Sequence, residues 1–324
     1  MSTDRPARKR SLAVRRATDL AATHLVALVL IAVVAVGSYV AQALAVDRAK
    51  FGARSPRTHQ ISTNLAFLHK TMGEYEEAER LYLEALADQE DALDPEHPDV
   101  LVTVNNLGRL YQATGRLEEA EHHLRRATEG GARRLGELHP QALAWRSNLG
   151  LVLHDRGRLE EAEVELTRAL EGREAALDAT HPETLKSVNN LAYLYMDLGR
   201  DEEALACFER SLAGRTERLG EAHPQAINAV VSLGWFHQRR GRLDEAEAYY
   251  RRAVETCRAG GEALGEVLPQ QLALLARLRI QQGRTDEAEA LGREVLELWP
   301  ADHPRRPQAE ALWEEIRGAG EGDG

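Results

Sequence analysis

Apolar and polar positions along most of the chain follow the spacing of two short amphipathic helices per repeat. In residues 61–98, Leu65 and Leu68 mark the apolar face of the first, which we name helix A. Ala78 begins a second apolar run at helical spacing, named helix B. Gly73 lies between them, where a glycine just past a helix end supplies a left-handed turn. The pattern predicts a helix–turn–helix unit.

This unit recurs every 42 residues. A glycine followed five residues later by an alanine marks each copy: Gly73/Ala78, Gly115/Ala120, Gly157/Ala162, Gly199/Ala204, Gly241/Ala246 and Gly283/Ala288. A fixed period of this length indicates a repeat architecture. The sequence therefore predicts an all-α solenoid. Its six units are 57–98, 99–140, 141–182, 183–224, 225–266 and 267–304.

The first four units end in the same dipeptide, His97-Pro98, His139-Pro140, His181-Pro182 and His223-Pro224. Proline disfavours helix at the preceding residue, so the motif separates helix B from the next helix A. Packed helices lie about 8–10 Å apart, whereas zinc–nitrogen bonds are about 2.0–2.1 Å. A histidine ladder at repeat spacing cannot converge on one ion, and we expect no metal site.

These residues resemble the tetratricopeptide repeat in its 42-residue kinesin-light-chain form. The pattern Asn-Leu-Ala/Gly, Gly, Glu-Glu-Ala and His-Pro carries the resemblance, which covers roughly residues 57–304. It implies a right-handed superhelical solenoid of about six and a half repeats. The fifth and sixth units depart from the pattern, with Ser232 and Leu274 in place of asparagine. Residues 305–317 predict a capping helix, and the glycine-rich residues 318–324 a disordered tail.

In such a superhelix the A helices line the concave face, and the resemblance implies that extended peptides bind there. Four asparagines fall at one equivalent helix-A position: Asn64, Asn106, Asn148 and Asn190. An amide both donates and accepts, so it can pair with a peptide backbone of any sequence. Alternatively, these amides bond between neighbouring A helices and hold the curvature. The two interpretations are compatible.

Specificity is expected from positions one turn to either side of these asparagines. They are Phe67, Lys70, Arg109, Lys186, Tyr193, Trp235 and Arg239, with Asn105 and Asn189 beside the ladder. Bases mixed with aromatic rings suit a protein or peptide partner that has an acidic segment and an apolar anchor. The alternative is a set of scattered, solvated bases on a helix face. Only Lys186 with Asn190 resembles part of a carboxylate clamp.

The start of the chain departs from the repeat. Residues 1–24 are basic and expected to be disordered, whereas residues 25–46 hold no charge. A bilayer needs about 20 apolar residues, so this stretch predicts a transmembrane anchor. Ala43-Leu44-Ala45 resembles a signal-peptide cleavage site. The 42-residue phase instead assigns residues 43–56 to the second half of a degenerate repeat, into which the anchor runs.

A soluble cap helix and a cleaved signal peptide stay open as alternatives to the anchor. The basic flank favours a single-pass membrane protein with its N-terminus in the cytoplasm and its repeats outside. Basic residues on the other flank weaken this orientation. The alternative localisation is a soluble cytoplasmic protein.

Composition excludes several functions. The net charge of −11 argues against nucleic-acid binding, which needs a basic surface. Cys207 and Cys257 have no metal-site spacing, and the sequence holds no phosphate loop and no converging catalytic set. We therefore expect a non-enzymatic interaction scaffold with no cofactor. The alternatives are a soluble, self-assembling structural scaffold and an accessory subunit of an enzyme complex.

Overall fold

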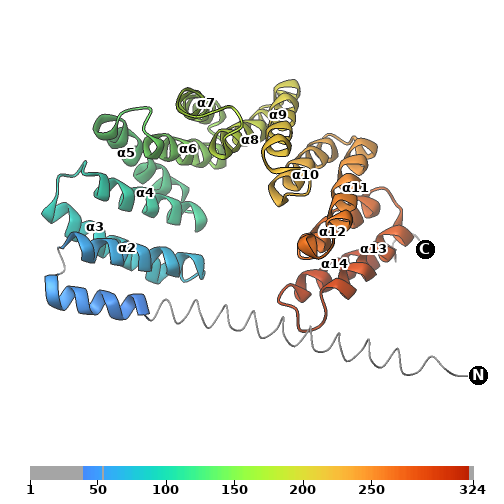
Figure 1. Cartoon of the computed structure of the whole chain (residues 1–324), viewed down its shortest axis with the longest axis horizontal. Helices are drawn as coiled ribbons and strands as arrows, with labels where there is room; N and C mark the ends of the chain where they lie inside the picture. Colours follow the sequence, from blue (N-terminus) through green and yellow to red (C-terminus); the bar gives the residue numbers. More distant parts are fainter. Residues whose placement is uncertain (1–38, 53–54, 321–324) are drawn as a thin grey trace, which may run out of the picture. The chain divides into compact units, whose positions relative to one another are not determined.

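The computed structural model describes residues 39–52 and 55–320, and these residues form helices and turns with no strand. Each A helix is followed by a tight turn and a B helix, which confirms the all-α repeat fold (Figure 1). The A helices are α2 (Pro56–Thr71), α4 (Pro98–Ala113), α6 (Pro140–Asp155), α8 (Pro182–Asp197), α10 (Pro224–Arg239) and α12 (Leu268–Gln281). The B helices are α3 (Tyr75–Ala92), α5 (Leu117–Leu135), α7 (Leu159–Ala176), α9 (Asp201–Leu219), α11 (Leu243–Ala259) and α13 (Thr285–Leu298).

The chain divides inside α9, between Gly214 and Arg215, into two compact units. The N-terminal unit is described from residue 39 to Gly214, and the C-terminal unit from Arg215 to residue 320. Each unit has its own apolar core. Leu107 and Leu124 are fully buried in the first core, and Leu272 in the second.

Histidine and proline together begin four of the A helices. In α4, Pro98 occupies the first turn, and His97 Nδ1 accepts a hydrogen bond of 3.2 Å from the backbone N–H of Asp99. The same 3.2 Å bond is made by His139, His181 and His223. These histidines are therefore helix N-caps, which explains why they recur at the turn.

A glycine in the left-handed region makes the turn from helix A to helix B. Gly157 has a φ of +73°, and its N–H donates to the carbonyl of His154 at 2.8 Å. The next N–H, of Arg158, reaches back to the carbonyl of Leu153 at 2.9 Å. These bonds satisfy carbonyls at the end of α6, and glycine is the residue that adopts this φ without strain.

Small residues let helices A and B of one repeat pack closely. Ala162 on α7 is completely buried. On α6, Gly150 packs against the same helix and has no room for a side chain, because an added Cβ would lie 2.7 Å from Leu166 Cγ. The alanine of each Gly/Ala pair is thus required by the A–B contact.

The fifth repeat ends differently from the first four. Between α11 and α12 the chain forms a short 3-10 helix, η1 (Gly261–Leu264), in place of a His-Pro turn. Val267 then precedes α12 with no side-chain cap. The loss of the capping histidine in the sequence therefore coincides with a change of turn structure.

The last helix is longer than predicted. Helix α14 (Arg306–Gly320) includes residues 318–320, which the sequence assigned to a disordered tail. Gly320 lies against Thr285 at the start of α13, where an added Cβ would be 3.4 Å from Thr285 Cγ2. The end of α14 therefore rests on α13. Residues 321–324 lie outside the described part.

The start of the chain is described only from residue 39. A helix over residues 39–51 contains the last eight residues of the predicted anchor, and Leu44 in it is buried in the core of the N-terminal unit. The predicted disordered segment 1–24 and residues 25–38 of the anchor lie outside the described residues. Within residues 39–52 and 55–320, no helix has the length and apolar character that a membrane span requires.

Candidate functional site

Consecutive A helices of the N-terminal unit contact each other, and one repeat position lines the face they share. We name this surface the A-helix face. That position holds Phe67, Arg109, Leu151 and Tyr193, one from each of α2, α4, α6 and α8. Phe67 and Arg109 are exposed. Tyr193 is half-buried, with its ring edge-on to Phe208 at a centroid distance of 5.1 Å. The aromatic residues predicted from sequence are therefore accessible.

The asparagines divide between structural and available roles. Asn148 Nδ2 donates to Asn105 Oδ1 at 2.9 Å, which links α6 to α4. Asn105 Nδ2 in turn lies 3.4 Å from Asn106 Oδ1. On α8, Asn189 Oδ1 and Asn190 Nδ2 are buried atoms with no hydrogen-bond partner among the described residues. Part of the ladder thus ties the stack together, and part retains bonding capacity.

Asn64, the first asparagine of the ladder, is exposed on α2. Lys186 is exposed near the start of α8, in the same helix as Asn190. Both residues of the partial clamp pattern seen in the sequence thus lie on one helix, and the clamp itself stays a prediction.

Two cations lie close together on this face. Burial and, second to it, the charge of Arg109 lower the pKa of Lys70 from 10.5 to about 8. Neither side chain forms an ion pair within the described part of the chain. Most other arginines of the solenoid are paired; Arg116, for example, lies 2.7 Å from Glu79 and 2.5 Å from Glu119. Lys70 and Arg109 therefore form a local excess of positive charge on an acidic protein.

The other two predicted groove residues belong to the C-terminal unit. Trp235 and Arg239 both lie on α10, with the guanidinium of Arg239 over the Trp235 ring at 5.6 Å from its centroid. Trp235 is half-buried and Arg239 is exposed. Such a cation–π pair presents an amphipathic surface. It belongs to the C-terminal unit and is therefore described separately from the A-helix face of the N-terminal unit.

Sequence reasoning missed a set of bridges between the C-terminal ends of neighbouring A helices. Gln112 Nε2 donates to Asp155 Oδ2 at 2.7 Å, and His154 Nε2 lies 2.7 Å from Asp197 Oδ2. Each pair is separated by one repeat plus one residue. The sequence contains these pairs as polar residues 43 positions apart. The spacing can be interpreted only once the structure shows how far neighbouring A helices are shifted relative to each other.

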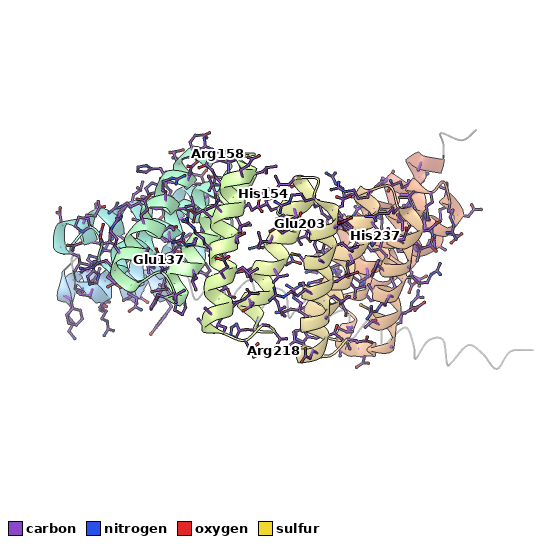
Figure 2. All side chains as sticks on the ribbon, turned by 90° about the horizontal axis from the view of Figure 1, so that it is seen from above. Glu137, His154, Arg158, Glu203, Arg218 and His237 are labelled. Atoms are coloured by element: carbon purple, nitrogen blue, oxygen red, sulfur yellow. The ribbon has the colours of Figure 1, made fainter. Side chains whose placement is uncertain are left out.

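A second missed network joins successive B helices. Arg158, directly after the turn glycine, donates to Glu161 of its own helix and to Glu121 of the preceding one, at 2.6–2.7 Å. Figure 2 shows Arg158 and His154 at the same end of the α6–α7 hairpin. Arg116 and Arg200 make equivalent pairs. Each of these arginines thus links two successive repeats.

Among the described residues, no group of three or more histidine, cysteine, aspartate or glutamate side chains is arranged to hold a metal ion. Burial raises the pKa of both thiols, Cys207 and Cys257. A raised pKa disfavours the thiolate, which is the reactive form.

Comparison with known families now decides the identity of the repeat. The tetratricopeptide repeat profile matches residues 57–131, 140–195 and 183–259, and a second tetratricopeptide repeat profile matches residues 269–294. The chain belongs to the tetratricopeptide repeat family. This membership and its structural neighbours support a protein–protein interaction scaffold.

Several solved tetratricopeptide repeat structures are similar to this one. A structure of nearly identical TPR-like repeats from a Podospora anserina kinesin light chain is 26% identical, with a TM-score of 0.58. The match covers 64% of this chain and 99% of that one. BtubC (BKLC) from P. vanneervenii is 24% identical, with a TM-score of 0.60 and coverage of 70% and 91%.

The type IV pilus biogenesis factor PilW is 20% identical, with a TM-score of 0.52 and coverage of 76% and 97%. At these identities, BtubC and PilW show a shared fold and nothing further. No curated protein matches the chain. The kinesin-light-chain resemblance of the repeats is confirmed by the Podospora anserina structure.

Proposed function

We propose that this tetratricopeptide repeat protein is a non-enzymatic scaffold that binds an extended segment of a partner protein along its A-helix face. The pair formed by Lys70 and Arg109 is the observation that carries the proposal. The lowered pKa of Lys70 reports that its charged form is disfavoured by burial and by Arg109. An acidic side chain placed between the two cations would relieve the repulsion and form charge-assisted hydrogen bonds.

The neighbouring groups suit the rest of such a segment. Exposed Phe67 and half-buried Tyr193 offer apolar contacts for a leucine or aromatic anchor. Exposed Asn64 has an amide that can bond to a peptide backbone, whereas the unpartnered amide atoms of Asn189 and Asn190 are buried. Lys186 adds a third cation on α8. The preferred partner segment is therefore acidic, with one apolar anchor.

A charge-reversal variant tests the proposal. Changing Lys70, Arg109 and Lys186 to glutamate is expected to abolish partner capture by affinity purification while the helical content stays unchanged. The matched control reverses three exposed cations elsewhere, Lys50, Arg134 and Arg168, which changes the net charge by the same amount. Equal partner recovery with both variants would show that the A-helix face is not the binding surface.

We also propose that residues 25–46 tether the scaffold to a membrane. The support is the uncharged length of this stretch in the sequence. Because Val40 and Leu44 pack on the core of the N-terminal unit, the end of this stretch lies on the solenoid, and the proposed tether is the part of the stretch that precedes this docked helix. Carbonate extraction of membranes tests the tether. Full release of the chain into the supernatant contradicts it and leaves the partner-binding proposal intact.

A further inference from the structure

A pocket of about 470 Å³ opens between the N-terminal halves of α2 and α4, with α3 beneath it. Its walls include Thr63 from α2 and Asp99 and Thr103 from α4, and Gln89 from α3 forms its floor. Arg57 lies at the rim, where its guanidinium is already bonded to Asp47 at 2.6 Å. Asn64, a groove residue predicted from the sequence, also lines this pocket.

Two buried polar atoms in this pocket have no partner among the described residues. Gln89 is only 2% exposed, and its Oε1 accepts no hydrogen bond. His59, which also lines the pocket, is 3% exposed, and its Nε2 is without a partner. Burial lowers the pKa of His59, against the raising effect of Asp88 and Asp99, so the ring stays neutral and able to accept. Native proteins rarely leave buried polar atoms unsatisfied.

The equivalent place two repeats later is filled by the chain itself. Arg173 on α7 is 4% exposed and extends between α6 and α8. Its Nη1 donates to Ser147 Oγ at 2.9 Å and also to Ser187 Oγ, and its Nη2 lies 3.4 Å from Glu183. A buried guanidinium is thus held by two hydroxyls and one carboxylate.

The pocket near α2 retains this partner set. Subtracting two repeats, 84 residues, converts Ser147, Ser187 and Glu183 into Thr63, Thr103 and Asp99, all of which line the pocket. The same shift converts Arg173 into Gln89. The pocket therefore keeps two hydroxyls and a carboxylate at the positions that bind the Arg173 guanidinium two repeats later. Its floor residue, Gln89, has no guanidinium to place between them.

The repeat between these two closes the same space in another way. Its floor residue is Gly131, and an added Cβ there would lie 2.6 Å from Trp145 Cε3, so the indole occupies the volume. In the N-terminal unit the floor is thus covered by Trp145 or filled by Arg173. At Gln89 it is left open.

We propose that this pocket binds the guanidinium of an arginine side chain carried by the partner protein. The pocket offers this guanidinium five hydrogen-bond acceptor groups: Asp99, Gln89 Oε1, the two threonine hydroxyls and His59 Nε2. A guanidinium offers five N–H donors in one plane, which suits acceptors that converge from three helices. The inference deepens the proposed function, since it adds to the partner an arginine near its acidic segment.

The test uses the full chain and small probes. N-acetyl-arginine N-methylamide is titrated while the side-chain NMR signals of Gln89 and His59 are followed. The citrulline analogue has the same shape without the charge and is expected to bind roughly tenfold or more weakly. Saturable shifts with arginine, together with weaker binding of citrulline, support the pocket. Equal affinity for the two probes overturns it, as does a lysine analogue that binds as tightly as arginine.

A designed variant provides a second readout. Gln89→Arg is expected to place the chain's own guanidinium in the pocket, as Arg173 does, and so to abolish probe binding and raise the melting temperature. Asp99→Asn is expected to weaken the probe about tenfold. Undiminished binding by folded Gln89→Arg contradicts the proposal. Partner capture is tested separately, by reversing Lys70, Arg109 and Lys186, none of which lines the pocket. If the arginine probe does not bind but partner capture still depends on those three cations, the pocket proposal is rejected and the proposed function stands.

Discussion

Replacing Glu121 with alanine removes a carboxylate that holds three arginines of the B-helix network. The Glu121 side chain is only 9% exposed. It accepts from Arg125 at 2.7 Å, from Arg158 at 2.6 and 2.7 Å, and from Arg156. Burial raises the pKa of Glu121, but the bonds from Arg125 and Arg158 outweigh this and the net pKa is lowered. The carboxylate is therefore charged at neutral pH, and its loss leaves three guanidinium groups without their common partner.

The expected magnitude follows from comparing this site with its repeat equivalent. Breaking a buried ion pair costs about 3–5 kcal/mol, whereas an exposed pair contributes about 0–1 kcal/mol. The three arginines are partly exposed and regain some hydration, so we expect Glu121→Ala to lose about 2–3 kcal/mol. One repeat later, Glu163 is 29% exposed and bonds to Arg200 at 2.7 Å. Glu163→Ala should lose no more than about 1 kcal/mol.

Urea unfolding of the full chain measures both losses. Trp145 is the only tryptophan in residues 39–214, so its signal in 5-fluorotryptophan ¹⁹F NMR reports the N-terminal unit alone. Glu121→Ala should shift the unfolding midpoint clearly more than Glu163→Ala. Equal shifts would refute the inference that burial and the number of arginine partners set the strength of this network.

Four further predictions concern the A-helix face, the histidine caps and the glycine turns. An acidic peptide should bind more weakly as the pH rises through about 8, because Lys70 loses its charge there. Calorimetric titrations should show that Lys70→Met removes this pH dependence. An affinity of the unmodified protein that does not change between pH 7 and 9 contradicts the prediction. With no peptide bound, the folded Lys70 loses its proton earlier than the unfolded one, so its contribution to stability rises between pH 8 and 10.5. His181→Ala should cost about 0.5–2 kcal/mol by thermal unfolding, with His181→Asn recovering most of it if the cap is the reason. Gly157→Ala should cost about 1–2 kcal/mol because its φ is +73°, and a neutral effect would show that the turn relaxes.

Much of the fold was predictable because each structural position recurs in several repeats, so the residue type that it requires can be read several times. The spacing of Gly157 and Ala162, with copies on either side, predicts a left-handed turn and a close helix contact, and both are present. The exposed aromatic position was equally accessible to prediction. Helical spacing places Phe67 on the solvent side of its amphipathic helix, and Phe67 is exposed. The same spacing places Tyr193 there, but it does not predict that the ring is half-buried against Phe208.

Other features depend on how neighbouring repeats are staggered, and one repeat read alone does not contain that information. The bond from Gln112 to Asp155 joins residues that are unremarkable within their own units. The capping role of His97 required the direction of its ring nitrogen. The pocket at Gln89 was recognised only by comparison with Arg173, because a different residue occupies the equivalent floor position in each of these repeats.

Photo-crosslinking tests most directly whether the A-helix face is the binding surface. Phe67 on helix A and Val164 on helix B are both 49% exposed, so a benzoylphenylalanine at either position reaches solvent equally. We expect one partner band to crosslink from position 67 and not from position 164. Crosslinking of the same band from position 164 alone, or equally from both, would contradict binding along the A helices.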